Sequence, residues 1–147
     1  MEKEQRVLIL VLGCLAAMGP MSIDLYLPAF PLLEADFSTN AAAVSNTMAS
    51  YFVGIALGQM IYGPVSDSYG RRGPLLFGLI LYLVGSVLCA AATTIDFLVA
   101  ARVLQALGGC AGMVICRAVV RDLFPPAQMA RVFSALLLVM GIAPVLA

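Results

Sequence analysis

Two charged side chains, Asp24 and Arg102, lie inside long apolar runs of this sequence. A charge in the hydrocarbon core of a bilayer costs about 2.5 kcal/mol or more on insertion scales, so each of these residues needs a reason to be there. One interpretation is proton chemistry: burial would favour protonation of Asp24 and a nearby Arg102 would favour release, so that a proton and a cationic ligand compete. Gln105 lies one helical turn beyond Arg102 and would share its face. The structural alternative places Asp24 in water near the membrane surface, with Arg102 extending toward the headgroups.

A second group of charges lies between two apolar runs, in the segment GPVSDSYGRRGPLLFG, residues 63–78. The simplest interpretation of Arg71 and Arg72 is that they orient the chain in the membrane. Gly70 would then form part of a tight turn, and Pro74 would start the next helix, where a missing N–H costs nothing.

This interpretation does not explain Asp67, because acidic residues contribute little to membrane orientation. Asp67 and Arg71 are four residues apart and could pair on one helical turn, but a surface pair of this kind contributes only a few tenths of a kcal/mol. A partner on another helix would be a stronger reason for both charges.

The overall composition is that of a chain whose solvent is lipid. Hydrophobic residues make up 63% and charged residues 11%, and the mean hydropathy is +1.04. The net charge is zero and the eight Lys and Arg are scattered, so we expect no nucleic-acid partner. There is no His, and the four cysteines lack metal-ligand spacing. We therefore expect no enzyme, no cofactor and no metal site.

The apolar runs have the length of transmembrane helices, since a bilayer core of about 30 Å needs roughly 20 apolar helical residues. The sequence predicts an all-α, polytopic transmembrane bundle, because backbone that faces lipid must satisfy its own hydrogen bonds. Residues 1–147 would form one transmembrane domain, with four complete spans and most of a fifth. The predicted spans are residues 7–30, 42–62, 74–92, 97–120 and 129–147.

The basic residues predict the orientation of these spans. The connections at residues 33–40 and 93–96 contain no Lys or Arg, whereas the alternate connections and the N-terminal segment do. This positive-inside pattern predicts a cytoplasmic N-terminus. The basic residues on the predicted cytoplasmic side are Lys3, Arg6, Arg71, Arg72, Arg117, Arg121 and Arg131.

Aromatic and glycine residues predict how the helix surfaces are used. Tyr26, Tyr51 and Tyr62 lie near predicted span ends, where aromatic belts face the membrane interface. The G-x-x-x-G spacings at residues 54–58 and 108–112 are more typical of close packing within a bundle than of dimerisation.

Three motifs, in order along the chain, resemble those of the major facilitator superfamily. The run from Gly63 through Asp67, Gly70, Arg71 and Arg72 is similar to its cytoplasmic loop motif, although Val65 replaces the usual Leu and Ser68 a frequent Arg. The stretch DLYLPAFP, residues 24–31, is similar to a signature of the Bcr/CflA group of drug:proton antiporters. Residues 102–106, RVLQA, resemble the R-x-x-Q-G motif, with Ala106 in the position of Gly.

The resemblance implies that the cytoplasmic loop is part of a gate between two halves of a transporter. Asp67 would contact a helix N-terminus in the other half, and Arg71 would pair with an acid at the end of the fourth span, for which Asp122 is the candidate. These contacts would hold the outward-facing state and break on the inward swing. Asp24 and Arg102, with Gln105, would then serve proton coupling and line the substrate cavity.

The same resemblance implies export of a hydrophobic or cationic drug in exchange for protons, across the bacterial inner membrane. Gly141 and Pro144 are similar to the start of the antiporter motif, but its later glycines are absent. Such transporters have two halves of six spans, so we expect this chain to lack the C-terminal half. Two alternatives remain open: a proton-linked uptake symporter, and a truncated membrane fragment that does not transport.

Overall fold

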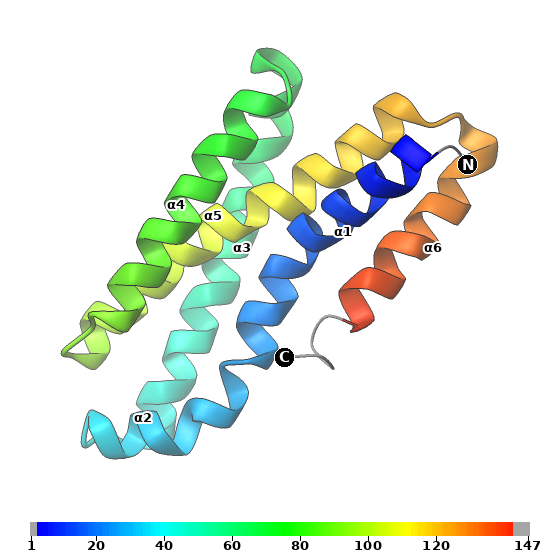
Figure 1. Cartoon of the computed structure of the whole chain (residues 1–147). Coiled ribbons are helices and arrows are strands. Elements are labelled where there is room, and N and C mark those ends of the chain that lie inside the picture. The colour runs from blue at the N-terminus through cyan, green and yellow to red at the C-terminus, as the bar shows by residue number, and fades with distance from the viewer. Residues whose placement is uncertain (1–2, 143–147) are drawn as a thin grey trace.

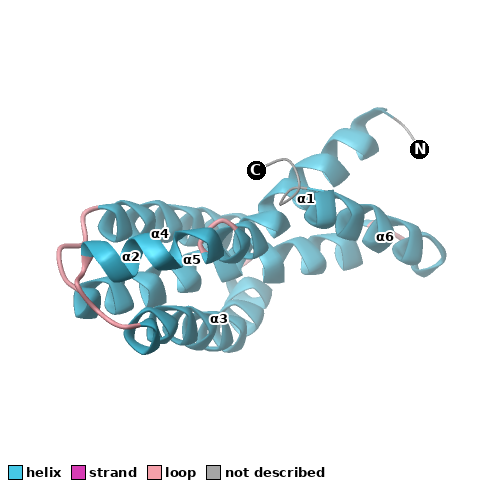
Figure 2. Ribbon diagram, turned by 90° about the horizontal axis from the view of Figure 1, so that it is seen from below, coloured by secondary structure: helices cyan, strands magenta, loops and turns pink. Residues whose placement is uncertain are grey.

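The computed structural model describes residues 3–142, and all its regular elements are helices (Figures 1 and 2). Four helical segments are long and apolar enough to cross a membrane, at residues 7–36, 41–69, 72–90 and 95–123. The predicted all-α transmembrane bundle is thereby confirmed. The elements are α1 (Lys3–Asp24), the 3-10 helix η1 (Leu27–Ala29), α2 (Phe30–Asp36), α3 (Ala41–Tyr69), α4 (Arg72–Ala90), α5 (Ile95–Leu123) and α6 (Pro126–Ile142).

The first helix ends earlier than the sequence pattern predicts. The apolar run predicts one span over residues 7–30, but α1 ends at Asp24 and the chain continues through η1 into α2. Pro28 supplies the reason, because it has no N–H to bond to the carbonyl of Asp24 and so cannot extend the α-helical pattern. The residues after Asp24 therefore leave the axis of α1.

Local side-chain chemistry sets the other helix boundaries. The side chain of Asn40 accepts a 2.9 Å hydrogen bond from the Ala43 N–H and caps α3, and Thr94 caps α5 in the same way. Gly70 ends α3 with φ at +80°, a conformation that glycine adopts without strain. The prediction that Pro74 starts the next helix was wrong by two residues. α4 begins at Arg72, and Pro74 lies in its first turn, where its missing N–H is still tolerated.

α5 lies at the centre of the bundle and packs against α1, α3 and α4 (Figure 1). Small residues allow this close approach. A Cβ on Gly54 of α3 would lie 2.7 Å from the Val103 carbonyl oxygen of α5, and a Cβ on Gly112 of α5 would lie 2.5 Å from that of Leu15 of α1. The predicted packing role of the two G-x-x-x-G spacings is confirmed, since both segments lie between helices.

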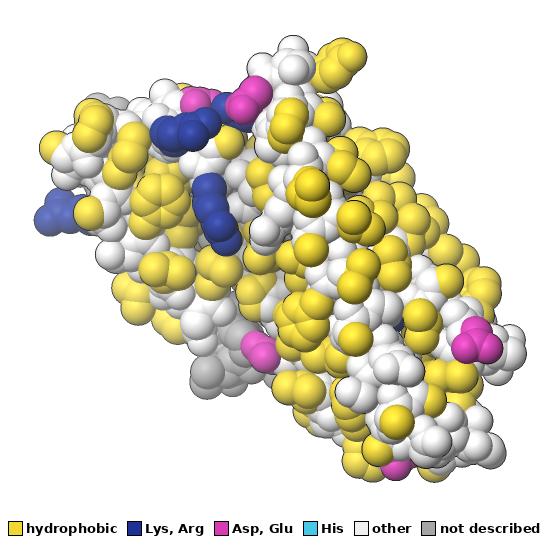
Figure 3. Space-filling model, turned by 180° about the vertical axis from the view of Figure 1, so that it is seen from behind, with side chains coloured by type: hydrophobic (Ala, Val, Ile, Leu, Met, Phe, Trp, Pro, Cys, Tyr) yellow, Lys and Arg dark blue, Asp and Glu magenta, His cyan; other side chains and the backbone are white. Residues whose placement is uncertain are grey.

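The two ends of the bundle differ in charge. The α3–α4 turn and the α5–α6 connection lie at the same end, whereas α2 and the α4–α5 connection lie at the other (Figure 1). We call the first end the basic end; its described basic residues are Arg71, Arg72, Arg117, Arg121 and Arg131. On the face drawn in Figure 3, Lys and Arg gather toward this end and hydrophobic side chains cover the middle. Large apolar side chains such as Phe77 and Leu83 of α4 are more than 60% exposed, as expected for a surface that contacts lipid.

Candidate functional site

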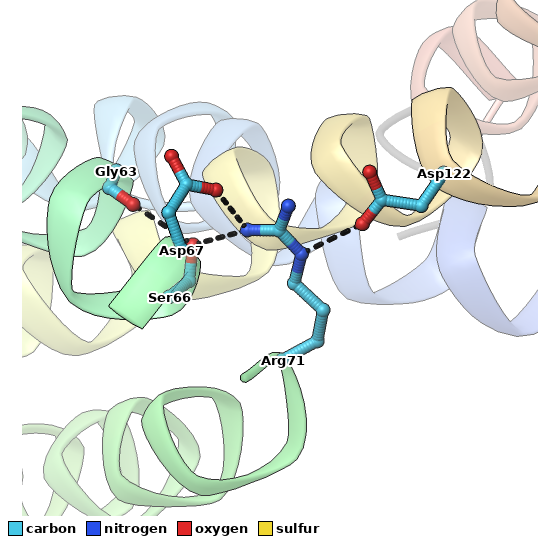
Figure 4. A network of polar contacts seen from close by, with 5 residues as sticks. All are labelled: Gly63, Ser66, Asp67, Arg71 and Asp122. Atoms are coloured by element: carbon cyan, nitrogen blue, oxygen red, sulfur yellow. Dashed lines mark hydrogen bonds and ion pairs between the residues drawn. The ribbon is translucent and has the colours of Figure 1, made fainter. Parts of the chain in front are cut away.

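At the basic end, Arg71 joins α3 and α5 through the Arg71 network, formed with Ser66, Asp67 and Asp122 (Figure 4). Its Nη1 donates to Asp67 Oδ1 at 2.6 Å and to Ser66 Oγ at 2.8 Å. Its Nε donates to Asp122 Oδ2 at 2.9 Å. The turn that follows Gly70 brings Arg71 between the end of α3 and the end of α5. One guanidinium therefore connects α3 and α5 across the α3–α4 turn.

The Arg71 network is accessible to water. The side chains of Asp67 and Asp122 are 57% and 45% exposed, and that of Arg71 is 22% exposed. The hydrogen bond to Asp122, and to a smaller extent the one to Asp67, raises the pKa of Arg71. The guanidinium is in any case charged at physiological pH. Exposed ion pairs contribute roughly 0–1 kcal/mol each. The network thus has the strength of a contact that can form and break, rather than of a permanent tie.

The structure brings together Arg71 and Asp122, which the resemblance pairs. It also gives Asp67 a partner within this chain, because Asp67 accepts a hydrogen bond from Arg71. The helix in the other half of a transporter, which the resemblance assigns to Asp67, is not among the described residues. A cavity of about 400 Å³ lies beside the network, lined by Arg117 and Arg121 among others. The sequence pattern assigned these two arginines only to membrane orientation.

Other residues of the loop motif occupy peripheral positions. Arg72 is exposed at the start of α4, and the carbonyl of Gly63 accepts a hydrogen bond from Ser66. Gly141 lies in the last turn of α6, and its surroundings are open. Pro144, the second residue of the predicted antiporter motif, lies outside the described residues.

A second polar cluster surrounds Arg102 inside α5. Arg102 is only 3% exposed, and its Nη1 donates to Gln105 Oε1 at 2.8 Å. Its Nη2 lies 3.4 Å from the carbonyl oxygen of Ser22 in α1. The guanidinium carbon lies 3.6 Å from the ring centroid of Tyr26 and 4.7 Å from that of Tyr51. Aromatic faces and neutral oxygens thus hold the charge.

A hydrogen-bond chain extends from Gln105 into α4 and α1. Gln105 Nε2 donates to Ser86 Oγ at 2.9 Å, and Ser86 donates to the Tyr82 carbonyl oxygen. The Tyr82 and Ser22 hydroxyls lie 2.6 Å apart. Because Ser22 also donates to the Met18 carbonyl oxygen, its single proton is committed and Tyr82 is the donor of that pair.

The Arg102 cavity is the open space beside this cluster, about 360 Å³ in volume. Arg102, Gln105, Ser22, Tyr26 and Tyr82 contribute to its lining, together with apolar side chains of α1. The volume falls within the range of roughly 300–1,000 Å³ that is typical of small-molecule sites. The arrangement can accept a small ligand between α1, α4 and α5.

The structure places the two intramembrane charges in different surroundings, and each agrees with a different one of the two interpretations. Arg102 does not extend toward the headgroups, because its guanidinium is buried between tyrosine rings. Asp24 is exposed at the end of α1 and does not line the Arg102 cavity. Among the described side chains, Asp24 forms no ion pair with Arg102. The break after Asp24 brings Tyr26, rather than the carboxylate, to Arg102.

Sequence reasoning missed several residues of this site. The sequence pattern places Tyr26 and Tyr51 at the membrane interface, but Tyr51 is fully buried and both rings contact Arg102. Tyr62, given the same assignment, is only 5% exposed. Tyr82 and Ser86 were not singled out. Their spacing of four residues within an apolar run puts them on one helical face, and this signal could have revealed them.

An apolar helical bundle with basic residues gathered at one end and a buried cation beside a cavity is the architecture of a multi-pass membrane protein. The chain belongs to the major facilitator superfamily, because the family model described as Major Facilitator Superfamily matches residues 12–147.

Curated relatives match almost the whole chain. It is 43% identical over 145 residues, 99% of its length, to the "Uncharacterized MFS-type transporter YdgK" of Bacillus subtilis (strain 168). It is 33% identical over 146 residues, again 99%, to the "Bicyclomycin resistance protein homolog" of Haemophilus influenzae. It is 30% identical over 148 aligned residues, 100% of its length, to "Multidrug resistance protein D" of Escherichia coli (strain K12). The chain spans only 36%, 37% and 38% of these relatives, respectively.

Proposed function

We propose that this chain forms the N-terminal part of a secondary transporter that exports drugs or small organic compounds in exchange for protons. The observation that carries the proposal is the bridge of Arg71 between Asp67 and Asp122. It links helices at the basic end through exposed ion pairs of low individual strength. Such a contact is suited to a gate that closes in one state and opens in the other.

The names of two relatives support drug export as the direction and substrate class, since they refer to bicyclomycin resistance and multidrug resistance. In this proposal the protein lies in a bacterial inner membrane, with its N-terminus and basic end in the cytoplasm. The Arg71 network then holds the outward-facing state. Completion of the cavity requires the opposite half of a transporter.

Proton coupling in this proposal uses Asp24. It is the acidic residue within the first apolar run, and its exposure in this chain leaves the carboxylate free to face a partner half or water. Arg102 and Gln105 contribute the polar wall of the cavity. Protonation of Asp24 and loading of substrate then alternate without requiring a direct Asp24–Arg102 pair.

The test uses the protein as its native gene encodes it, in inverted membrane vesicles with an acidic interior. Addition of bicyclomycin outside should release protons from the vesicles, detected with a pH-sensitive dye. Asp24→Asn should abolish this release, while Glu34→Gln, which removes a charge from α2, should retain it. Proton release that persists in Asp24→Asn would refute the role of Asp24. In a second set of vesicles loaded with bicyclomycin, its movement out together with protons would instead identify a symporter.

A further inference from the structure

The Arg102 cavity contains a buried positive charge without a carboxylate partner. Arg102 is 3% exposed, and both ion pairs found among the described side chains belong to Arg71. Its neighbours are the Gln105 amide oxygen, the Ser22 carbonyl, the Met48 sulfur and two tyrosine rings. All of these are neutral. A cation held in this way keeps a strong demand for negative charge or for hydrogen-bond acceptors.

The neighbouring hydroxyl groups do not meet this demand, because Arg102 donates to none of them among the described residues: its hydrogen bonds go to Gln105, the Ser22 carbonyl and the Met48 sulfur. The protons of these hydroxyls are used elsewhere. Tyr82 donates to Ser22, which donates to a backbone carbonyl of α1. Tyr26 and Thr47 hydroxyls lie 2.6 Å apart, and since Thr47 donates to the Val44 carbonyl oxygen, Tyr26 donates to Thr47.

The guanidinium, by contrast, has donors to spare. It carries five N–H groups, and its Nε has no hydrogen-bond partner among the described residues. The guanidinium beside the cavity therefore has a positive charge and N–H groups from which no described residue accepts. A ligand that complements this group carries oxygen acceptors, whereas a cation would place a like charge beside Arg102.

We infer that the Arg102 cavity binds the oxygen-acceptor part of a substrate, a carbonyl or carboxylate group, and discriminates against cations. This inference rests on the proposed transport function and narrows its substrate class, replacing the cationic drug that the family resemblance allowed. Arg102 supplies the donors, Gln105 fixes the guanidinium through its amide oxygen, and the apolar residues of α1 contact the rest of the ligand. Asp24, outside the cavity lining, does not attract a cation into it.

The experiment measures equilibrium binding to the purified protein, as its native gene encodes it, without a proton gradient. The probes are bicyclomycin, which is neutral and carries amide carbonyls, benzoate, which is a carboxylate, and tetraphenylphosphonium, a cation without acceptors. At least one of the two acceptor probes should bind ten times or more tighter than tetraphenylphosphonium. If tetraphenylphosphonium binds more tightly than both acceptor probes, or if all three bind equally, the inference is overturned. This comparison uses the parent protein alone.

The variants identify Arg102 as the origin of the selectivity. Arg102→Met should weaken the acceptor probe by about 10-fold to 100-fold, the range expected for loss of a hydrogen bond from a charged group, and should not weaken tetraphenylphosphonium. Arg102→Lys keeps the positive charge but loses the planar set of guanidinium N–H donors. It should still discriminate against tetraphenylphosphonium. The matched control Arg131→Gln removes an exposed arginine of α6 and should change neither. Unchanged acceptor binding in Arg102→Met would contradict the inference.

Binding and transport distinguish the two proposals. Arg102-dependent binding with no proton-coupled flux in vesicles would overturn drug:proton exchange and leave the assignment of the cavity intact. Proton-coupled flux of tetraphenylphosphonium through Arg102→Lys would keep the transporter and overturn the substrate class.

Discussion

The guanidinium carbon of Arg102 lies 3.6 Å from the ring centroid of Tyr26, although the two residues are 76 positions apart. Tyr26 follows the end of α1, and its hydroxyl also bonds Thr47 of α3. One side chain thus connects the end of α1 with α3 and α5. This contact explains how a buried charge is tolerated inside the bundle.

Removal of the Tyr26 ring should destabilise the bundle. Tyr26→Leu loses the aromatic face over Arg102, and a desolvated cation–π contact contributes about 2 kcal/mol. Tyr26→Phe keeps the ring and loses only the bond to Thr47, so its effect should be smaller. Thermal unfolding can be followed with a thiol-reactive dye, because Cys110 and Cys116 are buried in the folded state. Equal stability of the Leu variant and the parent would rule out this contribution.

Exchange of charges in the Arg71 network should rescue part of its function. Arg71→Asp and Asp122→Arg each break the 2.9 Å bond between α5 and the α3–α4 turn, and each should reduce the transport rate. The double variant restores an opposite-charge pair, but rescue should be incomplete because the new acid at position 71 repels Asp67. The rates are compared in a double-mutant cycle. Arg72→Asp is the matched control, and a double variant no better than the worse single change would argue against the pair.

Glycine at the helix contacts should be required for stability. Gly112→Ala places a Cβ 2.5 Å from the Leu15 carbonyl oxygen, so α1 and α5 must separate. Overpacking of this kind costs typically 1–3 kcal/mol. Gly63→Ala is the control, since its Cβ would meet nothing within 4 Å. The dye assay should show a lower unfolding temperature only for Gly112→Ala; equal shifts in both variants would exclude a packing effect.

Chemical labelling of new cysteines should reveal the orientation. The proposal of a cytoplasmic basic end places Asp96, at the start of α5, on the outer side and Ser68, near the end of α3, on the inner side. In intact cells Asp96→Cys should therefore react with an impermeant maleimide, and Ser68→Cys should react only after permeabilisation. The parent protein gives the background from its four native cysteines. The reverse pattern would invert the assigned topology.

Much of the fold followed from the sequence because lipid imposes strong local rules. Long apolar runs had to be helices, and the apolar spacing placed α3, α4 and α5 within a few residues of their observed starts. The end of α1 was the boundary that the sequence predicted least well. The apolar run continues to residue 30, but the helix ends at Asp24 because of Pro28. The packing of Gly54 and Gly112 was also expected, since small residues in apolar helices allow close contact.

The sequence by itself determined that the chain is a helical membrane protein with charged residues that need partners. It also identified Arg71, Arg102 and Gln105 by residue type and spacing, whereas Asp122 came from the family resemblance. Only the tertiary structure decided which groups surround each charge, because those partners come from helices distant in sequence. Because the chain leaves the axis of α1 after Asp24, Tyr26 contacts Arg102 and the Asp24 carboxylate is exposed. The local sequence shows that a helix breaks, but it does not show which way the following side chains will point.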